Sequence, residues 1–296
     1  MAYSINRTNR FQFSLTGVLD MARKIMKKKD MAISLVVLVI IIILTLFAHV
    51  ISPYDPNAIN LSNINLGPCS AHWLGTDYLG RDILSRILAG ASVSLSISAC
   101  VVTISLLFGV TIGCAIGYYG GILDDTISRV IDIFMAFPSM IFALAIMGAF
   151  GPSVINLIIA LVMVQWTAYA RVIRGQVLSI KEKEFIASVR TIGASDIQIF
   201  IRHILPNSIA PVIVMATIDI GHVILSIAAL NFLGIGLPAN IPEWGGMISS
   251  GKEFFTTAPF IIIFPGLAIT LVVIIFSILG DGMRDILNPV DEGGEL

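Results

Sequence analysis

The sequence predicts an all-α membrane protein with six transmembrane helices. Hydrophobic residues make up 56% of the 296 residues and charged residues only 12%, about half the charged fraction of a soluble globular domain. Six apolar runs approach or exceed the roughly 20 residues that a helix needs to cross a hydrocarbon core about 30 Å thick. Basic residues gather between alternate runs, as expected for a multispanning protein. These observations exclude a water-soluble globular domain.

The six predicted spans lie at 31–52, 91–118, 132–150, 154–171, 209–232 and 258–280. The first could be mistaken for a signal peptide, but its apolar run is too long and it follows a 30-residue polar lead. No small-x-small cleavage site follows it at Ile51-Ser52-Pro53. We therefore expect the first span to remain in the mature protein.

The distribution of lysine and arginine predicts the orientation of the chain. Of the 18 basic residues, all but Arg81, Arg86 and Lys252 lie before the first span, at Arg129, between 171 and 202, or at Arg284. With an even number of spans, these positions share one side of the membrane. The positive-inside rule then predicts that both termini and the segment 183–207 are cytoplasmic.

The chain is expected to divide into four parts. Residues 1–30 form a cytoplasmic N-terminal segment, 31–90 the first span and an external loop, 91–290 a five-helix core, and 291–296 a cytoplasmic tail. Within the first part, apolar residues from Phe11 to Ile25 recur at helical spacing beside basic residues, which predicts an interfacial helix. The alternative is a disordered basic tail that only sets the topology.

Glycines recur every four residues in the second predicted span, at Gly109, Gly113 and Gly117. This spacing places bare backbone along one helical face and allows a neighbouring helix to approach closely. We expect these residues to serve packing, not chemistry.

A charged segment from Lys183 to Asn207 separates the fourth and fifth spans. Its first helix is expected to carry four apolar residues on one face: Phe185, Ile186, Val189 and Ile192. Gly193 supplies a helix stop, and Ser195 with Gln198 forms a capping-box pattern that begins a second helix. Because isolated helices this short are marginal in water, we expect the segment to pack against another surface. It is a candidate contact site for a soluble partner.

Two ionisable residues, Asp219 and His222, lie inside the fifth predicted span. Ionisable side chains within a membrane face the bundle interior by default, and a separation of three places both on one helical face. They could contact a substrate in transit, or they could hydrogen-bond to each other and to a neighbouring helix. We assign no firm metal site, and the three cysteines lack metal-type spacing.

The external loop before the second span contains three charged residues close together, Asp77, Arg81 and Asp82. Such residues could pair and fix a tight turn, so a structural clamp is the favoured interpretation. Docking of an external partner is the alternative.

Motifs throughout the chain resemble those of permease subunits in binding-protein-dependent ABC importers of the peptide/nickel branch. The segment 183–207 is similar to the conserved cytoplasmic loop of these permeases at Gly193, Leu205 and Pro206, although Ala187, Ser188, Val189 and His203 depart from the general pattern. The other matching motifs are His72-Trp73-Leu74-Gly75-Thr76-Asp77, Gly80-Arg81-Asp82, Phe232-Leu233-Gly234-Ile235-Gly236, Glu243-Trp244-Gly245 and Gly280-Asp281. The resemblance covers nearly all of residues 31–290.

The resemblance implies a type I ABC importer permease fold in the inner membrane of a prokaryote. It implies a second homologous permease, two cytoplasmic ATPase subunits and an extracytoplasmic binding protein as partners, besides membrane lipid, and no nucleic acid. The sequence has no G-x-x-x-x-G-K-[ST] phosphate loop, so we expect no catalysis and no cofactor in this chain, and ATP use by the partners. The coupling-helix residues would be Glu184, Phe185, Ile186, Val189, Arg190, Ile192 and Gly193. The alternative for this helix is capping of the bundle interior.

The substrate is predicted from residues that differ between the nickel and dipeptide permeases of this family. His222 in the fifth span and His72-Trp73 in the external loop look more like nickel permeases than dipeptide ones, so nickel, free or chelated, is the expected substrate and a dipeptide or oligopeptide is the alternative. A different class, a secondary transporter or channel, is also considered, but the chain shows no convincing internal repeat of the kind common in such proteins.

Overall fold

The structure is a computed structural model that describes residues 28–287. The interfacial helix predicted between Phe11 and Ile25 and the tail at 291–296 lie outside the described residues.

Helices dominate the described chain. Its α-helices are α2 (Lys29–Leu46), α3 (Ala48–Ile51), α4 (Ile83–Tyr119), α5 (Gly121–Ala136), α6 (Ser139–Phe150), α7 (Val154–Lys181), α8 (Glu184–Thr191), α9 (Asp196–Ile199), α10 (Leu205–Ser208), α11 (Ala210–Phe232), α12 (Trp244–Gly251) and α13 (Phe260–Leu287). Short turns of helix are η1 (Leu61–Asn63), η2 (Phe200–Ile204, π-helical) and η3 (Lys252–Phe254). Between residues 28 and 287 the only extended pairing is a single bridge between Thr76 and Asp82.

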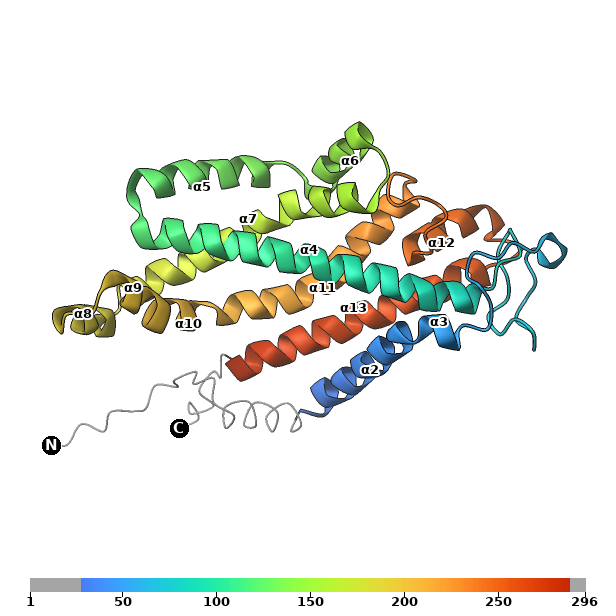
Figure 1. The fold of residues 1–296 in the computed structure, drawn as a ribbon, viewed down its shortest axis with the longest axis horizontal. Coiled ribbons are helices and arrows are strands. Elements are labelled where there is room, and N and C mark those ends of the chain that lie inside the picture. Colours follow the sequence, from blue (N-terminus) through green and yellow to red (C-terminus); the bar gives the residue numbers. More distant parts are fainter. Residues whose placement is uncertain (1–27, 288–296) are drawn as a thin grey trace, which may run out of the picture.

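The long helices lie side by side and form one bundle (Figure 1). We call the end that carries α8, α9 and α10 the insert end. The opposite end, which carries the loop at 52–82 and α12, is called the loop end. Within the described chain, α2, α4, α7, α11 and α13 are each long and apolar enough to cross a membrane, and α5 with α6 passes the same test as a bent pair, which gives five spans, or six if the pair is one span. The predicted all-helical membrane architecture is therefore confirmed, and the predicted six spans are the upper of these two counts.

The third predicted span, 132–150, is not one continuous helix. α5 and α6 meet at an angle of 85°, and the break falls at Phe137 and Pro138. Proline lacks an N–H and disfavours helical backbone at the preceding residue, so the helix ends here. Hydropathy does not detect this break because both sides are apolar.

Several helices extend beyond the predicted apolar spans. α4 begins at Ile83 instead of 91, α7 continues to Lys181 instead of 171, and α13 continues to Leu287 instead of 280. These extensions are more polar than the spans, so a search for apolar runs ends too early. α12, between the fifth and sixth spans, was not predicted because it is only eight residues long.

The three spaced glycines bring α4 into direct contact with α7. A Cβ added at Gly109 would lie 2.5 Å from the carbonyl oxygen of Trp166, and one at Gly113 would lie 2.3 Å from that of Ala170. At Gly117 the corresponding oxygen, that of Arg174, would lie 3.1 Å away. The predicted packing face is confirmed, and α7 is thereby held against α4 along three turns.

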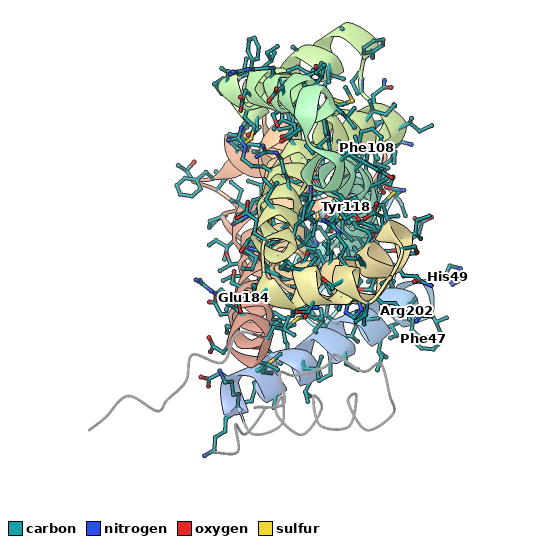
Figure 2. All side chains as sticks on the ribbon, turned by 90° about the vertical axis from the view of Figure 1, so that its left-hand side faces the viewer. Phe47, His49, Phe108, Tyr118, Glu184 and Arg202 are labelled. Carbon is teal, nitrogen blue, oxygen red and sulfur yellow. The ribbon has the colours of Figure 1, made fainter. Side chains whose placement is uncertain are left out.

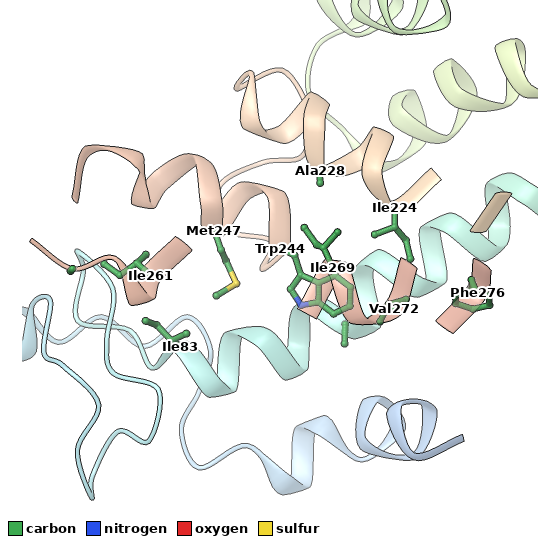
Figure 3. Packing of buried hydrophobic residues seen from close by; sticks show 11 residues of the cluster. Ile83, Ile224, Ala228, Trp244, Met247, Ile261, Ile269, Val272 and Phe276 are labelled. Atoms are coloured by element: carbon green, nitrogen blue, oxygen red, sulfur yellow. The ribbon is translucent and has the colours of Figure 1, made fainter. Parts of the chain in front are cut away.

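At the loop end, the indole of Trp244 lies in the hydrophobic core where α4, α11, α12 and α13 meet (Figure 3). Trp244 is 2% exposed, and its Nε1 donates a 3.0 Å hydrogen bond to the carbonyl oxygen of Ile87. Buried tryptophan needs such a partner for its N–H. Trp244 therefore anchors the short helix α12 to the bundle.

Candidate functional site

The insert, residues 183–207, folds around a left-handed glycine. α8 ends at Thr191, and Gly193 has a φ of +89°, a conformation that glycine adopts without the steric cost of a Cβ. The side chain of Ser195 accepts a hydrogen bond from the Gln198 backbone, and the Gln198 side chain accepts one from the Ser195 backbone. This capping box begins α9, and the chain then continues through η2 and α10 into α11.

The apolar residues of α8 divide between two environments. Ile186 is 1% exposed and packs in a core with Ile199 and Ile204. Phe185 is 41% exposed and Ile192 is 83% exposed. The expectation that Phe185, Ile186, Val189 and Ile192 form one contact face is therefore corrected: Ile186 is covered by this chain's own core, and Val189 packs at its edge. Of these four, Phe185 and Ile192 are the side chains left available to a partner.

Polar contacts join the insert to the end of α4. The Tyr118 hydroxyl donates a 2.8 Å hydrogen bond to Asp196 Oδ1, and Lys181 Nζ donates one of 2.6 Å to the carbonyl oxygen of Tyr118. Arg190 Nη2 lies 3.5 Å from the same Asp196 oxygen. Figure 2 looks onto the insert end, with Tyr118 on α4 and Glu184 on α8. Tyr118 of α4 therefore contacts the insert through its hydroxyl and the end of α7 through its carbonyl oxygen.

In the fifth span, Asp219 and His222 contact each other. His222 Nδ1 lies 3.3 Å from Asp219 Oδ1, and the two side chains are 64% and 9% exposed, respectively. The other oxygen of Asp219, Oδ2, is buried, and so is the hydroxyl of Tyr169 on α7, which interacts with this carboxylate. An exposed imidazole near the middle of a span would face hydrocarbon unless protein or water covers it, which is costly. This face of α11 is therefore unsuited to lipid.

A cavity of about 430 Å³ opens between α7, α11 and α13 beside this pair. Its polar lining consists of Gln176, Asp219, His222 and Arg284. No group of three or more histidine, cysteine, aspartate or glutamate residues that could hold a metal ion occurs in residues 28–287. The site therefore carries charges of both signs but no set of metal ligands.

In the loop, Asp77, Arg81 and Asp82 are all buried, with 4%, 6% and 3% exposure. Arg81 Nε lies 2.7 Å from Asp77 Oδ2, while Asp82 accepts a 2.8 Å hydrogen bond from the backbone of Ser85 at the start of α4. His72 Nδ1 lies 2.9 Å from Asp82 Oδ1. Sequence reasoning missed His72 as a partner, because ten residues separate the two. Burial of these charges favours the clamp over direct docking.

A second polar network, at the loop end, was also missed. Glu243 is 1% exposed and accepts hydrogen bonds from Asn231 Nδ2 at 2.8 Å and from the Gly246 backbone at 2.9 Å. Ser94 on α4 completes the set, 3.3 Å away. Burial raises the pKa of the Glu243 carboxyl above its ordinary value, against these hydrogen bonds, which lower it. The Glu243-Trp244-Gly245 motif was the available signal.

The long apolar helices and the polar insert between α7 and α11 define a multispanning membrane protein. Residues 109–290 match the family described as binding-protein-dependent transport system inner membrane component. Residues 19–68 match the N-terminal transmembrane domain of oligopeptide transport permease C. The chain belongs to this permease family and is an ABC importer permease subunit of the inner membrane.

Relatives of known assignment cover almost the whole chain. The dipeptide transport system permease protein DppC of Alkalihalophilus pseudofirmus is 44% identical over 90% of this chain and 88% of its own length. The glutathione transport system permease protein GsiD of Escherichia coli is 42% identical over 90% and 89%. These names do not support the nickel expectation and agree better with its peptide alternative.

A solved structure has a similar fold. The MetNI methionine ABC transporter in an inward-facing conformation contains a chain that is 20% identical, with a TM-score of 0.54, over 70% of this chain and 98% of that one. At this identity the likeness concerns the fold alone. The type I importer permease fold is confirmed, and such a permease works with ATPase and substrate-binding partners.

Proposed function

We propose that this chain is a permease subunit of a peptide importer, forms half of the translocation pathway beside a second homologous permease, and is moved through its insert by cytoplasmic ATPase subunits. The single observation that supports a translocation pathway along α11 is the exposure of His222, a 64% exposed imidazole within a span. A side chain of this kind has to face protein or water instead of lipid. Dipeptide and glutathione permeases as relatives support the substrate class.

The insert supplies the route for mechanical input. Phe185 and Ile192 offer exposed apolar side chains, which suit a groove on a partner in the manner of other helix-in-groove contacts. Arg190 and Glu184 add orienting charges at the rim. Because α7 leads into the insert and α11 leaves it, movement of the insert displaces two of the three helices that line the charged cavity.

Orientation follows from the same proposal. The insert end is assigned to the cytoplasm and the loop end to the opposite side, as the basic residues predict. The clamp of Asp77, Arg81 and Asp82 then stiffens the surface nearest the external binding protein, with its charges covered.

Uptake by the assembled importer tests the function. The permease pair, the ATPases and the binding protein are placed in liposomes, and ATP-dependent uptake of radiolabelled dialanine, glutathione and nickel is measured. The proposal expects uptake of at least one peptide, with no nickel uptake above that of empty liposomes. Nickel uptake without peptide uptake would refute the substrate class, and uptake by this chain alone, without ATP, would favour a secondary transporter.

A further inference from the structure

We infer that the cavity between α7, α11 and α13 is a binding site for both ends of a short zwitterionic peptide, with the peptide ammonium at Asp219 and His222 and its carboxylate at Arg284. The inference rests on the proposed function and adds to it the position and orientation of the cargo. The cavity volume of about 430 Å³ falls within the range of about 300–1,000 Å³ typical of small-molecule sites.

The carboxylate of Asp219 has no lysine or arginine partner among the described residues. Its Oδ1 lies 3.3 Å from His222 Nδ1, and the buried Tyr169 hydroxyl of α7 also interacts with it. An ionisable side chain inside a span is costly unless its charge is balanced. A primary ammonium brings three donors and a positive charge. It therefore supplies the positive charge that would balance Asp219.

The opposite charge comes from α13. Arg284 is exposed and lines the same cavity, and no ion pair between it and another residue of the described chain is present. A guanidinium presents a planar fork of donors that matches a carboxylate. Gln176 on α7 adds an uncharged amide to the lining.

The register of α11 and α13 sets the spacing of the two charges. α13 packs on α11 where Gly280 meets Ile218, since a Cβ at Gly280 would lie 2.2 Å from Ile218 Cγ1. The two helices run in opposite directions (Figure 1), and each residue adds 1.5 Å of rise. Relative to the contact between Gly280 and Ile218, Arg284 therefore lies about 6 Å toward the insert end and Asp219 about 1.5 Å toward the loop end.

The two charged residues are thus separated by about 7–8 Å along the bundle. A fully extended dipeptide spans about 7 Å at 3.3–3.6 Å per residue. The order of the two charges along the bundle directs the amino end of the peptide toward the loop end, and the long arginine side chain can meet the carboxylate of a dipeptide or a somewhat longer peptide. Apolar Met215 and Ile218 between the charges accept aliphatic side chains.

Protection of a thiol in the cavity tests the site directly. Met215→Cys is made in the purified complex after the native cysteines have been replaced by alanine; these are Cys69, Cys100 and Cys114. The rate of alkylation is measured with dialanine, with N-acetyl-dialanine and with dialanine amide, each at the same millimolar concentration. We expect dialanine to slow alkylation at least threefold and each singly blocked peptide to do so less.

Two variants assign the ends. In wild type, dialanine should slow alkylation more than either blocked peptide. Asp219→Asn should abolish the difference between dialanine and the N-acetyl peptide, and Arg284→Gln should abolish the difference between dialanine and the amide. Asp281→Asn, which removes an exposed charge from α13 outside the cavity lining, should leave both advantages intact. If Asp219→Asn prevents assembly, Arg284→Gln alone decides, because Arg284 is exposed.

Equal protection by all three peptides, no protection by any, or full protection in both cavity variants would overturn the inference. Uptake measured on the same wild-type complex separates the two proposals. Peptide uptake without selective protection leaves the proposed function standing and removes this site. Selective protection without peptide uptake removes the proposed function.

Discussion

Replacing Gly113 by alanine should drive α4 and α7 apart. The added Cβ would lie 2.3 Å from the carbonyl oxygen of Ala170 and 2.4 Å from Ile173 Cγ2, roughly 1 Å closer than ordinary contacts between such atoms, which lie near 3.5 Å. One neighbour is backbone, so the clash cannot be relieved by turning a side chain. Overpacking of this kind costs about 1–3 kcal/mol.

Gly175→Ala is the matched control on the facing helix. Gly175 is exposed on α7, and no atom would lie within 4 Å of its added Cβ. Alanine is favoured over glycine in a helix by about 1 kcal/mol at both positions, so the difference between the two variants isolates the clash.

Thermal unfolding of the assembled importer measures the effect. A difference of 1 kcal/mol shifts Tm by about 2–4 °C in proteins near this size, so Gly113→Ala should unfold several degrees below Gly175→Ala. If the two variants have the same Tm, the close contact between α4 and α7 is not present in the protein and the account of this packing fails.

Three further changes have expected outcomes. Ile186→Ala should destabilise the protein by about 2–5 kcal/mol because it empties a buried site, whereas Ile192→Ala should leave Tm unchanged and lower peptide-dependent ATP hydrolysis; equal effects on Tm would contradict this division. Asp82→Ala removes the cap of α4 and the partner of His72, so Tm should fall by the equivalent of at least about 1 kcal/mol, and an unchanged Tm would remove the clamp. Glu243 has a raised pKa in the folded state, so its contribution to stability is full below the pKa of the unfolded chain and is lost as pH rises through the folded pKa. The Glu243→Gln variant should therefore have a higher Tm than the wild type at pH 8 and a similar Tm at pH 4.5. A lower Tm of the variant at both pH values would refute this.

Much of the fold could be predicted from the sequence because its signals are local. Apolar runs identified the five unbroken spans and part of the bent pair α5 and α6, and the spacing of Gly109, Gly113 and Gly117 identified the face that α7 covers. The capping pattern at Ser195 also predicted a helix start. Each of these depends on residues within one or two helical turns of one another.

The remaining features depend on contacts between distant residues. Ile186 and Ile192 are the same residue type in one short apolar set, yet only the first meets a core that includes residues of α7 and η2. Glu243 contacts Ser94, 149 residues away along the chain, and Arg284 joins Asp219 in one cavity only because α13 returns alongside α11. No local pattern encodes these pairings.

The central claim is that the insert transmits movement from an ATPase, and cysteine cross-linking tests it most directly. Ile192→Cys places a thiol at an 83% exposed position on the insert, while Ile186→Cys places one in the core as a control. In the assembled importer, a short bifunctional reagent should join the first variant to an ATPase subunit, in an amount that changes when ATP is bound, and should leave the second unjoined. Active peptide transport with no cross-link at Ile192, in either nucleotide state, would contradict the account.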